Sequence, residues 1–153
     1  MFTVRRAVSE DVERITGILR NAGVNEKGVD KHVERFLVVE DPSVTPKRMV
    51  GTVGLEVYGD RGLLRSFVMD NQSWNARTGM ELIELVLQFA RKSGLSEIYL
   101  LAGISSNIFE YFGFRPLAWE DLPLDVRQSE HVHQSKTEGG QPMVYRRANV
   151  AES

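Results

Sequence analysis

The feature that most constrains the fold is an antiparallel hairpin that runs directly into a long helix and a further strand. Residues 49–58 and 63–69 are rich in apolar and β-branched side chains, and the glycines at both ends of residues 59–62 indicate a tight turn. Residues 75–93 carry an apolar stripe at helical spacing, and residues 97–101 form a buried strand. Because a strand, a helix and a strand in sequence pair through a right-handed crossover, this unit predicts a mixed sheet covered by helices.

The rest of the chain adds short elements on either side of this unit. Apolar periodicity predicts further strands over residues 2–6, 36–39, 114–118 and 143–147. It predicts further helices from the N-cap Ser9 to Gly23 and over residues 26–35, 106–112 and 120–129. We expect one α/β domain over residues 1–153, with six or seven strands, helices on both faces, a loop over residues 134–141 and a flexible tail over about 148–153.

Composition narrows the class of protein. The chain has 153 residues, enough for one domain with a core of its own. Its net charge of −2 argues against a nucleic-acid partner, and its lack of cysteine excludes disulfides and thiolate catalysis and argues against a zinc site. The N-terminus lacks the apolar core of a signal peptide, and no apolar run approaches the roughly 20 residues of a membrane span. We therefore expect a cytoplasmic protein with no membrane partner.

Three segments together resemble the GNAT superfamily of acetyl-CoA-dependent N-acetyltransferases. They are Gly54-Leu-Glu-Val-Tyr-Gly59 with Gly62-Leu-Leu-Arg-Ser66, then Glu97-Ile-Tyr-Leu-Leu101, and Ile108-Phe-Glu-Tyr-Phe-Gly-Phe-Arg-Pro116. The first of these, with residues 119–127, resembles the branch found in arsenic-resistance operons, which is itself similar to the acetyltransferase domain of N-acetylglutamate synthase. The resemblance implies a GNAT-like fold, acetyl-CoA as co-substrate and a small-molecule amine as acceptor. A homodimer is a possible assembly, since the fold often dimerises through its last strands.

The segment before the long helix departs from the superfamily's pyrophosphate loop. That loop has the pattern Gln/Arg-x-x-Gly-x-Gly/Ala at a helix start, where backbone amides and the helix dipole favour phosphate. Aligned on Gly79, this chain has Trp74-Asn-Ala-Arg-Thr-Gly79, so only the last glycine matches. Arg77 is either a charge-assisted phosphate ligand or a solvated arginine. The resemblance implies cofactor binding by Phe67, Val68, Met69, Trp74, Asn75, Ala76, Arg77, Thr78, Gly79 and Asn107.

The catalytic groups are expected on the hairpin. The resemblance implies that a main-chain N–H near Val68, where the fourth strand bulges, polarises the acetyl carbonyl. Glu56, a carboxylate within an apolar run, is the candidate base, unless it lies on an exposed strand face. Arg65 needs a carboxylate partner, which is either Glu56 across the hairpin or the carboxylate of an acceptor. Ser66 is either structural or a further acceptor contact.

The sequence also offers candidates for a general acid and for a metal ligand. Many members of the superfamily use a tyrosine acid where this chain has Phe109, and Tyr111 would face the opposite side of a helix, so we expect Tyr111 to pack rather than to catalyse. A leaving thiolate can instead be protonated by solvent. His131 and His133 form a His-x-His without a third ligand, so we expect surface histidines or contacts at the rim of the acceptor site, and no metal site.

Two functions of different class remain open from the sequence. The first is an N-acetyltransferase for the primary amine of a small molecule, such as an amino acid or an analogue. The second is a non-catalytic GNAT-fold module that binds CoA weakly or not at all and acts through a protein partner or as a dimer. The glycine-poor segment from Trp74 to Thr78 keeps the second function open. Acceptor specificity is expected to come from residues 24–35 and 128–142.

Overall fold

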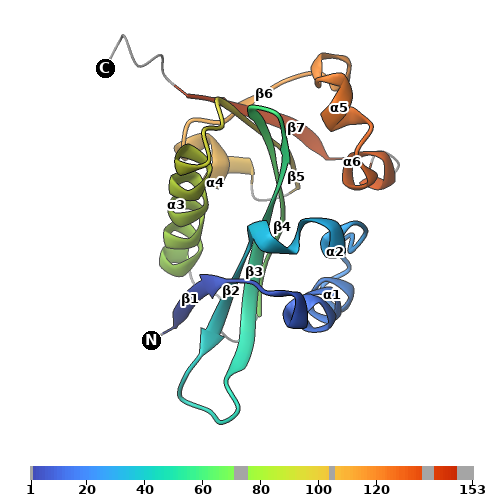
Figure 1. The fold of residues 1–153 in the computed structure, drawn as a ribbon. Coiled ribbons are helices and arrows are strands. Elements are labelled where there is room, and N and C mark those ends of the chain that lie inside the picture. The colour runs from blue at the N-terminus through green and yellow to red at the C-terminus, as the bar shows by residue number, and fades with distance from the viewer. Residues whose placement is uncertain (1, 71–75, 104–105, 136–139, 148–153) are drawn as a thin grey trace.

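The computed structural model describes residues 2–70, 76–103, 106–135 and 140–147. Its centre is one mixed sheet of seven strands in the order β1-β2-β3-β4-β5-β7-β6 (Figure 1). The strands are β1 Thr3–Arg6, β2 Phe36–Asp41, β3 Arg48–Tyr58, β4 Arg61–Met69, β5 Glu97–Ala102, β6 Arg115–Pro116 and β7 Gln141–Arg146. Strands β1 to β4 pair antiparallel in sequence order, β4 pairs with β5 in parallel, and β7 pairs antiparallel with both β5 and β6.

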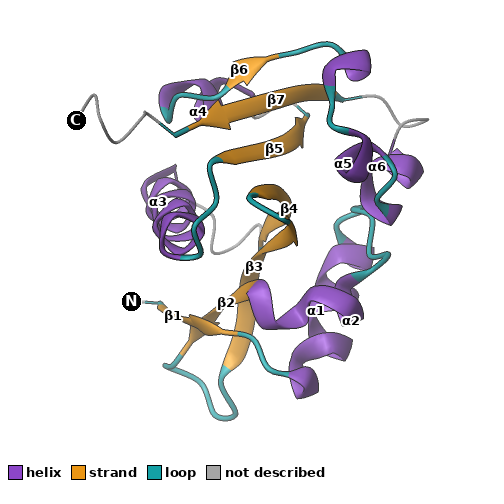
Figure 2. Ribbon diagram, turned by 45° about the horizontal axis from the view of Figure 1, so that its top comes forward, coloured by secondary structure: helices purple, strands orange, loops and turns teal. Residues whose placement is uncertain are grey.

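Helices cover both faces of the sheet, as the sequence predicts (Figure 2). The helices are α1 Val12–Asn21, α2 Val29–His32, α3 Ala76–Lys92, α4 Ser106–Tyr111, α5 Leu124–Arg127 and α6 Glu130–Ser135. The long helix α3 and the short α4 lie on one face, whereas α1, α2, α5 and α6 lie on the other. The seven-stranded mixed α/β sheet is therefore confirmed.

The two faces of the sheet are packed differently. On the α3 face one continuous core joins the apolar stripe of α3 to β3, β4 and β5. On the opposite face there are two separate clusters, one under α1 and α2 around Ile15 and Phe36, the other under α5 and α6 around Leu63 and Val126. Each such fully buried aliphatic or aromatic side chain stabilises the fold by about 1.5–3 kcal/mol. The strip of sheet between these two clusters carries polar residues, and it is there that the candidate site lies.

Several predicted boundaries were wrong, and proline accounts for the largest error. The predicted helix over residues 120–129 is instead the end of a 3-10 turn, Trp119–Asp121, and the short α5. Pro123 holds Leu122 in an extended conformation and is itself the N-cap of α5, so no helix crosses it. The predicted strand over residues 114–118 shortens to Arg115–Pro116.

Smaller corrections concern the ends of helices. Ser9 is not an N-cap: Val8 precedes a 3-10 turn, and its N–H donates to the Asp11 side chain at 2.8 Å. The predicted helix over residues 26–35 is α2 followed by a further 3-10 turn. Residues 134–135 complete α6 instead of opening a loop. The tail over 148–153 and residues 136–139 lie outside the described residues.

Candidate active site

The strand β4 separates from β5 and then bulges. Its pairing with β3 is regular up to Gly54 opposite Arg65, and resumes with Thr52 opposite Val68, so β4 has one extra residue in between. The parallel pairing with β5 covers three residue pairs, the last of them Leu63 with Tyr99. Within the described residues, β4 then continues to its end without a strand partner on its β5 side.

The bulge is built around Ser66. This is the one residue other than glycine among the described residues with positive φ, at 62°. A residue with a Cβ in this left-handed region costs about 1–2 kcal/mol, so surrounding contacts must hold it. The Ser66 hydroxyl accepts a hydrogen bond of 2.9 Å from the Nε of Arg65. Phe67 and Val68, whose backbone is predicted to bind the cofactor, follow directly.

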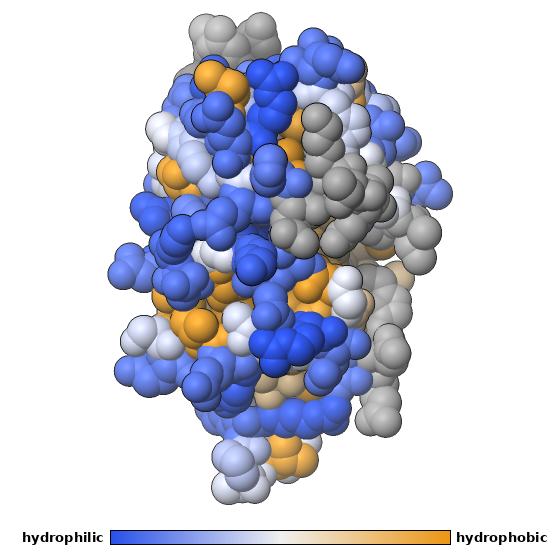
Figure 3. All heavy atoms as spheres, turned by 90° about the vertical axis from the view of Figure 1, so that its right-hand side faces the viewer, coloured by the Kyte–Doolittle hydropathy of each residue, from blue (hydrophilic) through white to orange (hydrophobic). Residues whose placement is uncertain are grey.

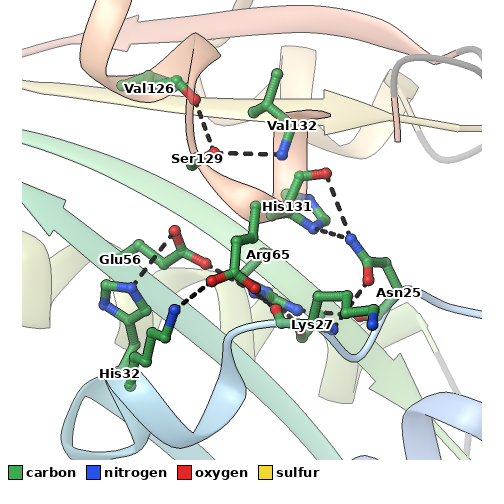
Figure 4. Close-up of polar contacts among 12 residues, drawn as sticks. Asn25, Lys27, His32, Glu56, Arg65, Val126, Ser129, His131 and Val132 are labelled. Atoms are coloured by element: carbon green, nitrogen blue, oxygen red, sulfur yellow. Dashed lines mark hydrogen bonds and ion pairs between the residues drawn. The ribbon is translucent and has the colours of Figure 1, made fainter. Parts of the chain in front are cut away.

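Arg65 is fully enclosed, with none of its side chain exposed. Its Nη1 donates to Glu56 Oε2 at 2.7 Å and also to the carbonyl of Lys27, and its Nη2 donates to the carbonyl of Asn25 at 3.0 Å (Figure 4). The predicted internal pair with Glu56 across the hairpin is therefore confirmed. An acceptor carboxylate could reach Arg65 only by displacing one of these partners.

Glu56, the predicted base, is buried rather than exposed. Its side chain is 2% exposed, and both carboxylate oxygens have partners. Oε2 accepts from Arg65, and Oε1 accepts from the hydroxyl of Tyr58. The Nε2 of His32 on α2 lies 3.7 Å from Oε1. Glu56 therefore has no free oxygen facing solvent, and a proton would reach it through a neighbour.

His32 and Tyr58 are the neighbours through which protons could move. The His32 side chain is 22% exposed, and partial burial lowers its pKa, against the opposing effect of the Glu56 carboxylate. The imidazole is therefore neutral at physiological pH and can accept a proton. Burial, helped by the hydrogen bond to Glu56, raises the pKa of Tyr58, so this hydroxyl remains a donor. Sequence reasoning missed His32, because nothing in residues 26–35 shows that α2 lies over β3.

On the other side of Arg65, His131 is buried, so its predicted place at the surface was wrong. Its Nδ1 lies 3.4 Å from the Nδ2 of Asn25 (Figure 4). Burial, with a contribution from the charge of Arg65, lowers the pKa of His131 to about 3. Ser129 stabilises the start of α6, because its hydroxyl accepts a hydrogen bond from the N–H of Val132. His133 is exposed, as predicted.

The start of α3 is where the resemblance places the pyrophosphate. Arg77 is 90% exposed and forms an ion pair with Glu81 one turn later, at 3.2 Å. This geometry leaves both interpretations of Arg77 open. Within the same turn Thr78 is partly buried and Gly79 is buried, while Ala76 is exposed. Trp74 and Asn75 lie outside the described residues, and Asn107 is exposed in the first turn of α4.

Two hollows lie beside residues predicted to bind the cofactor, and neither is lined by Glu56, Arg65 or His32. One of about 540 Å³ lies between α1, β3 and the end of β4, next to Val68 and Met69. The oppositely charged side chains of Arg48 and Asp70, which pair with each other, line it as well. The other hollow, of about 620 Å³, lies between α3, α4 and β7 and includes Arg77. Figure 3 looks onto the face that carries α1, α2, α5 and α6, and polar side chains cover most of it with smaller apolar patches between them.

The two aromatic positions of α4 differ from each other. Phe109 is buried and packs edge-on against Phe67 and Phe114, so it belongs to the core. Tyr111 was predicted to pack rather than to catalyse; it is 74% exposed and lines the larger hollow. Among the described residues, the only aromatic ring that the Tyr111 ring contacts is that of the neighbouring Phe112.

Among the described residues, no group of three or more histidine or acidic side chains could hold a metal ion. No helix in the same part of the chain is long and apolar enough to cross a membrane.

Comparison with known proteins identifies the fold. No family model matches the sequence, and no curated protein sequence matches it. Among solved structures, N-acetylglutamate synthase from Neisseria gonorrhoeae, complexed with coenzyme A and N-acetyl-glutamate, aligns with a TM-score of 0.77 and 20% identity over 95% of this chain. This chain spans about a third of that enzyme, 35% of its length.

Shorter proteins match over their full length. Rv2747 from Mycobacterium tuberculosis, in complex with CoA, aligns with a TM-score of 0.74 and 22% identity, over 95% of this chain and 99% of that one. An acetyltransferase of the GNAT family from Staphylococcus aureus aligns with a TM-score of 0.72 and 14% identity, also over 95% and 99%. At these identities the likeness shows the fold, which is that of the GNAT acetyltransferases.

Proposed function

Because this chain has the GNAT fold, we propose that it transfers the acetyl group of acetyl-CoA to the primary amine of a small molecule. The observation that carries this proposal is the end of the pairing between β4 and β5 at Leu63, followed by the bulge at Ser66. In the proposed complex, the backbone of Phe67 to Met69 pairs with the amide groups of a pantetheine arm, as an added strand would. An N–H of this segment also serves to polarise the acetyl carbonyl.

The remainder of the cofactor is proposed to lie toward the start of α3. The backbone N–H groups and dipole of a helix N-terminus suit a pyrophosphate, and α3 has 17 residues. Arg77 is within the same turn and faces the hollow of about 620 Å³. Several of the similar structures were crystallised with coenzyme A, which supports acetyl-CoA as the co-substrate.

The proposed reaction forms one bond and breaks one. The neutral amine nitrogen attacks the acetyl carbon, a C–N bond forms, and the C–S bond of the thioester breaks. The amine loses a proton to His32, whose lowered pKa keeps the imidazole neutral, and the neighbouring Glu56 stabilises the imidazolium that results. In this proposal His32 is the base, and Glu56 assists it by stabilising its charged form rather than by taking the proton itself. Solvent returns a proton to the leaving thiolate.

We propose an amino acid or an analogue as the acceptor. Residues 24–35, predicted to set acceptor specificity, carry the proposed base His32, and Asn25 of the same segment contacts His131 of the second such segment, residues 128–142. The acceptor is proposed to lie between these two segments. The similar synthase was crystallised with N-acetyl-glutamate and, in a second structure, with L-arginine, which supports the same class of acceptor.

The test is the amine-dependent release of CoA from acetyl-CoA, measured with the purified protein over a panel of amino acids and simple amines. His32→Gln is expected to lower kcat by about 10²-fold or more, the usual contribution of general base catalysis. It should leave the affinity for acetyl-CoA unchanged, and His133→Gln, at an exposed histidine, is the matched control. No release with any amine would refute the proposal and favour the non-catalytic module. Unchanged turnover in His32→Gln would remove His32 from the mechanism.

A further inference from the structure

We infer that Arg65 is a positioning residue that joins the loop before α2 to the bulge of β4. Through it, the wall of the acceptor site and the backbone that polarises the acetyl carbonyl are held as one unit. The inference rests on the proposed function, and it assigns to Arg65 a role different from binding the acceptor.

The guanidinium of Arg65 contacts three separate segments of the chain. Arg65 donates to the carbonyls of Asn25 and Lys27 in the loop between α1 and α2, to Glu56 on β3, and to Ser66 in the bulge (Figure 4). Arginine suits such a task, because its planar group presents five donors in a fixed geometry. Since the whole side chain is buried, a change at any one of these partners is transmitted to the others.

The backbone of the loop between α1 and α2 packs closely against Arg65. Gly28 follows Asn25 and Lys27, whose carbonyls accept hydrogen bonds from Arg65. Its left-handed φ of 81° turns the chain into α2. A Cβ on Gly28 would lie 3.5 Å from Nη1 of Arg65, so the backbone passes directly over the guanidinium. The position of α2, and with it the position of His32, follows from this approach.

Arg65 also contacts the strained residue of the β4 bulge, Ser66. A serine held at a φ of 62° is strained, and a strained residue keeps its conformation only when its surroundings fix it. The hydrogen bond from Arg65 Nε to the Ser66 hydroxyl helps to fix this conformation, and Arg65 in turn contacts the loop between α1 and α2. The polarising N–H groups follow Ser66 in the chain, so their direction depends on this bond.

The cluster also reaches the C-terminal part of the fold. The Asn25 side chain, from the same loop, donates to the carbonyl of His131 at 3.4 Å and lies equally close to its Nδ1. Lys31 of α2 additionally forms an ion pair with Glu130 of α6. Both segments predicted to set acceptor specificity, residues 24–35 and 128–142, are therefore connected to Arg65.

The test compares Arg65→Lys with the matched control Arg61→Lys. Lysine retains the charge for Glu56, but its single ammonium cannot reach Ser66 and both loop carbonyls together. Arg61 is a partly exposed arginine of the same strand, paired with Glu97. The kinetic readouts are kcat and KM for two acceptors, one with a carboxylate and one without. A second readout, independent of turnover, is amide hydrogen exchange over residues 24–28 and 66–69.

For Arg65→Lys we expect kcat to fall about tenfold or more with both acceptors, because a small misplacement of reacting groups is costly. Amide exchange should rise in both segments together, and Arg61→Lys should change neither readout. A higher KM for the carboxylate-bearing acceptor alone, with kcat kept, would instead make Arg65 an acceptor ligand. Faster exchange in only one segment would also refute the coupling. If wild-type protein turns over no acceptor, the proposed function fails, yet the exchange result still decides the coupling.

Ser66→Gly provides a second variant that is expected to fold, since glycine adopts a positive φ without strain. It removes the hydroxyl that Arg65 holds. If Arg65 acts through Ser66, the double variant Arg65→Lys with Ser66→Gly loses no more kcat than Arg65→Lys alone. Fully additive losses would show that the two residues act separately and would overturn the inference.

Discussion

The buried imidazole of His131 makes the stability of the fold depend on pH in a defined window. Burial lowers its pKa from 6.5 to about 3 in the folded state. Above pH 6.5 the residue is neutral in both states and contributes no pH dependence. Below 6.5 the unfolded chain binds a proton that the folded chain does not, so the free energy of unfolding falls by about 1.4 kcal/mol per pH unit. Between pH 6.5 and pH 5 the loss amounts to about 2 kcal/mol.

Urea denaturation of wild-type protein and His131→Asn, at several values between about pH 7.5 and about pH 5, isolates this contribution. Other titrating groups, including His32 with its own lowered pKa, are common to both proteins and cancel in the difference. The Asp11 carboxylate, whose pKa the hydrogen bond from Arg5 lowers, loses its stabilising effect only at more acidic pH.

The stability advantage of wild type over His131→Asn should shrink by about 2 kcal/mol as pH falls from 6.5 to 5. His133→Asn, at an exposed histidine two residues along α6, is the matched control for the substitution itself. Parallel curves for wild type and His131→Asn would contradict the reasoning, since they would mean that His131 takes up protons equally in both states.

Two further predictions concern packing and the cofactor. Gly54→Ala should destabilise the fold by about 1–3 kcal/mol in urea denaturation, because its Cβ would lie 2.3 Å from the ring of Phe36, whereas Gly17→Ala in α1, with open space around it, should not destabilise. A loss for Gly17→Ala as large as that for Gly54→Ala would refute the steric argument. Arg77→Gly should weaken acetyl-CoA binding in calorimetry by about tenfold, or about 1.4 kcal/mol, if the side chain binds phosphate. Glu81→Gln, which frees Arg77 from its ion pair, should not weaken it, and tighter binding by Arg77→Gly would mean that the arginine obstructs the site.

The parts of the fold that the sequence predicts well are those whose information is local. The hairpin, α3 and β5 follow from apolar spacing and from glycines at the turns, and the structure has them within a few residues. The pair between Arg65 and Glu56 also follows, because a buried arginine requires a carboxylate and the hairpin register brings one near.

What the sequence does not predict depends on contacts between distant segments. His131 is buried, and it contacts Asn25, 106 positions earlier in the chain. Nothing near His131 signals this contact, and a His-x-His in a polar stretch is typical of a surface. The position of His32 beside Glu56 similarly depends on how α2 lies over the sheet. The break at Pro123, in contrast, carried a local signal, since proline restricts the residue before it.

The central claim, that this GNAT fold binds acetyl-CoA along β4 and at the start of α3, is tested most directly by calorimetric titration of the purified protein with acetyl-CoA. The account predicts saturable binding with a Kd in the micromolar range, about −8 kcal/mol. It also predicts that Arg77→Gly weakens that binding. Absence of any heat of binding at millimolar acetyl-CoA would contradict the account and leave the fold without its proposed co-substrate.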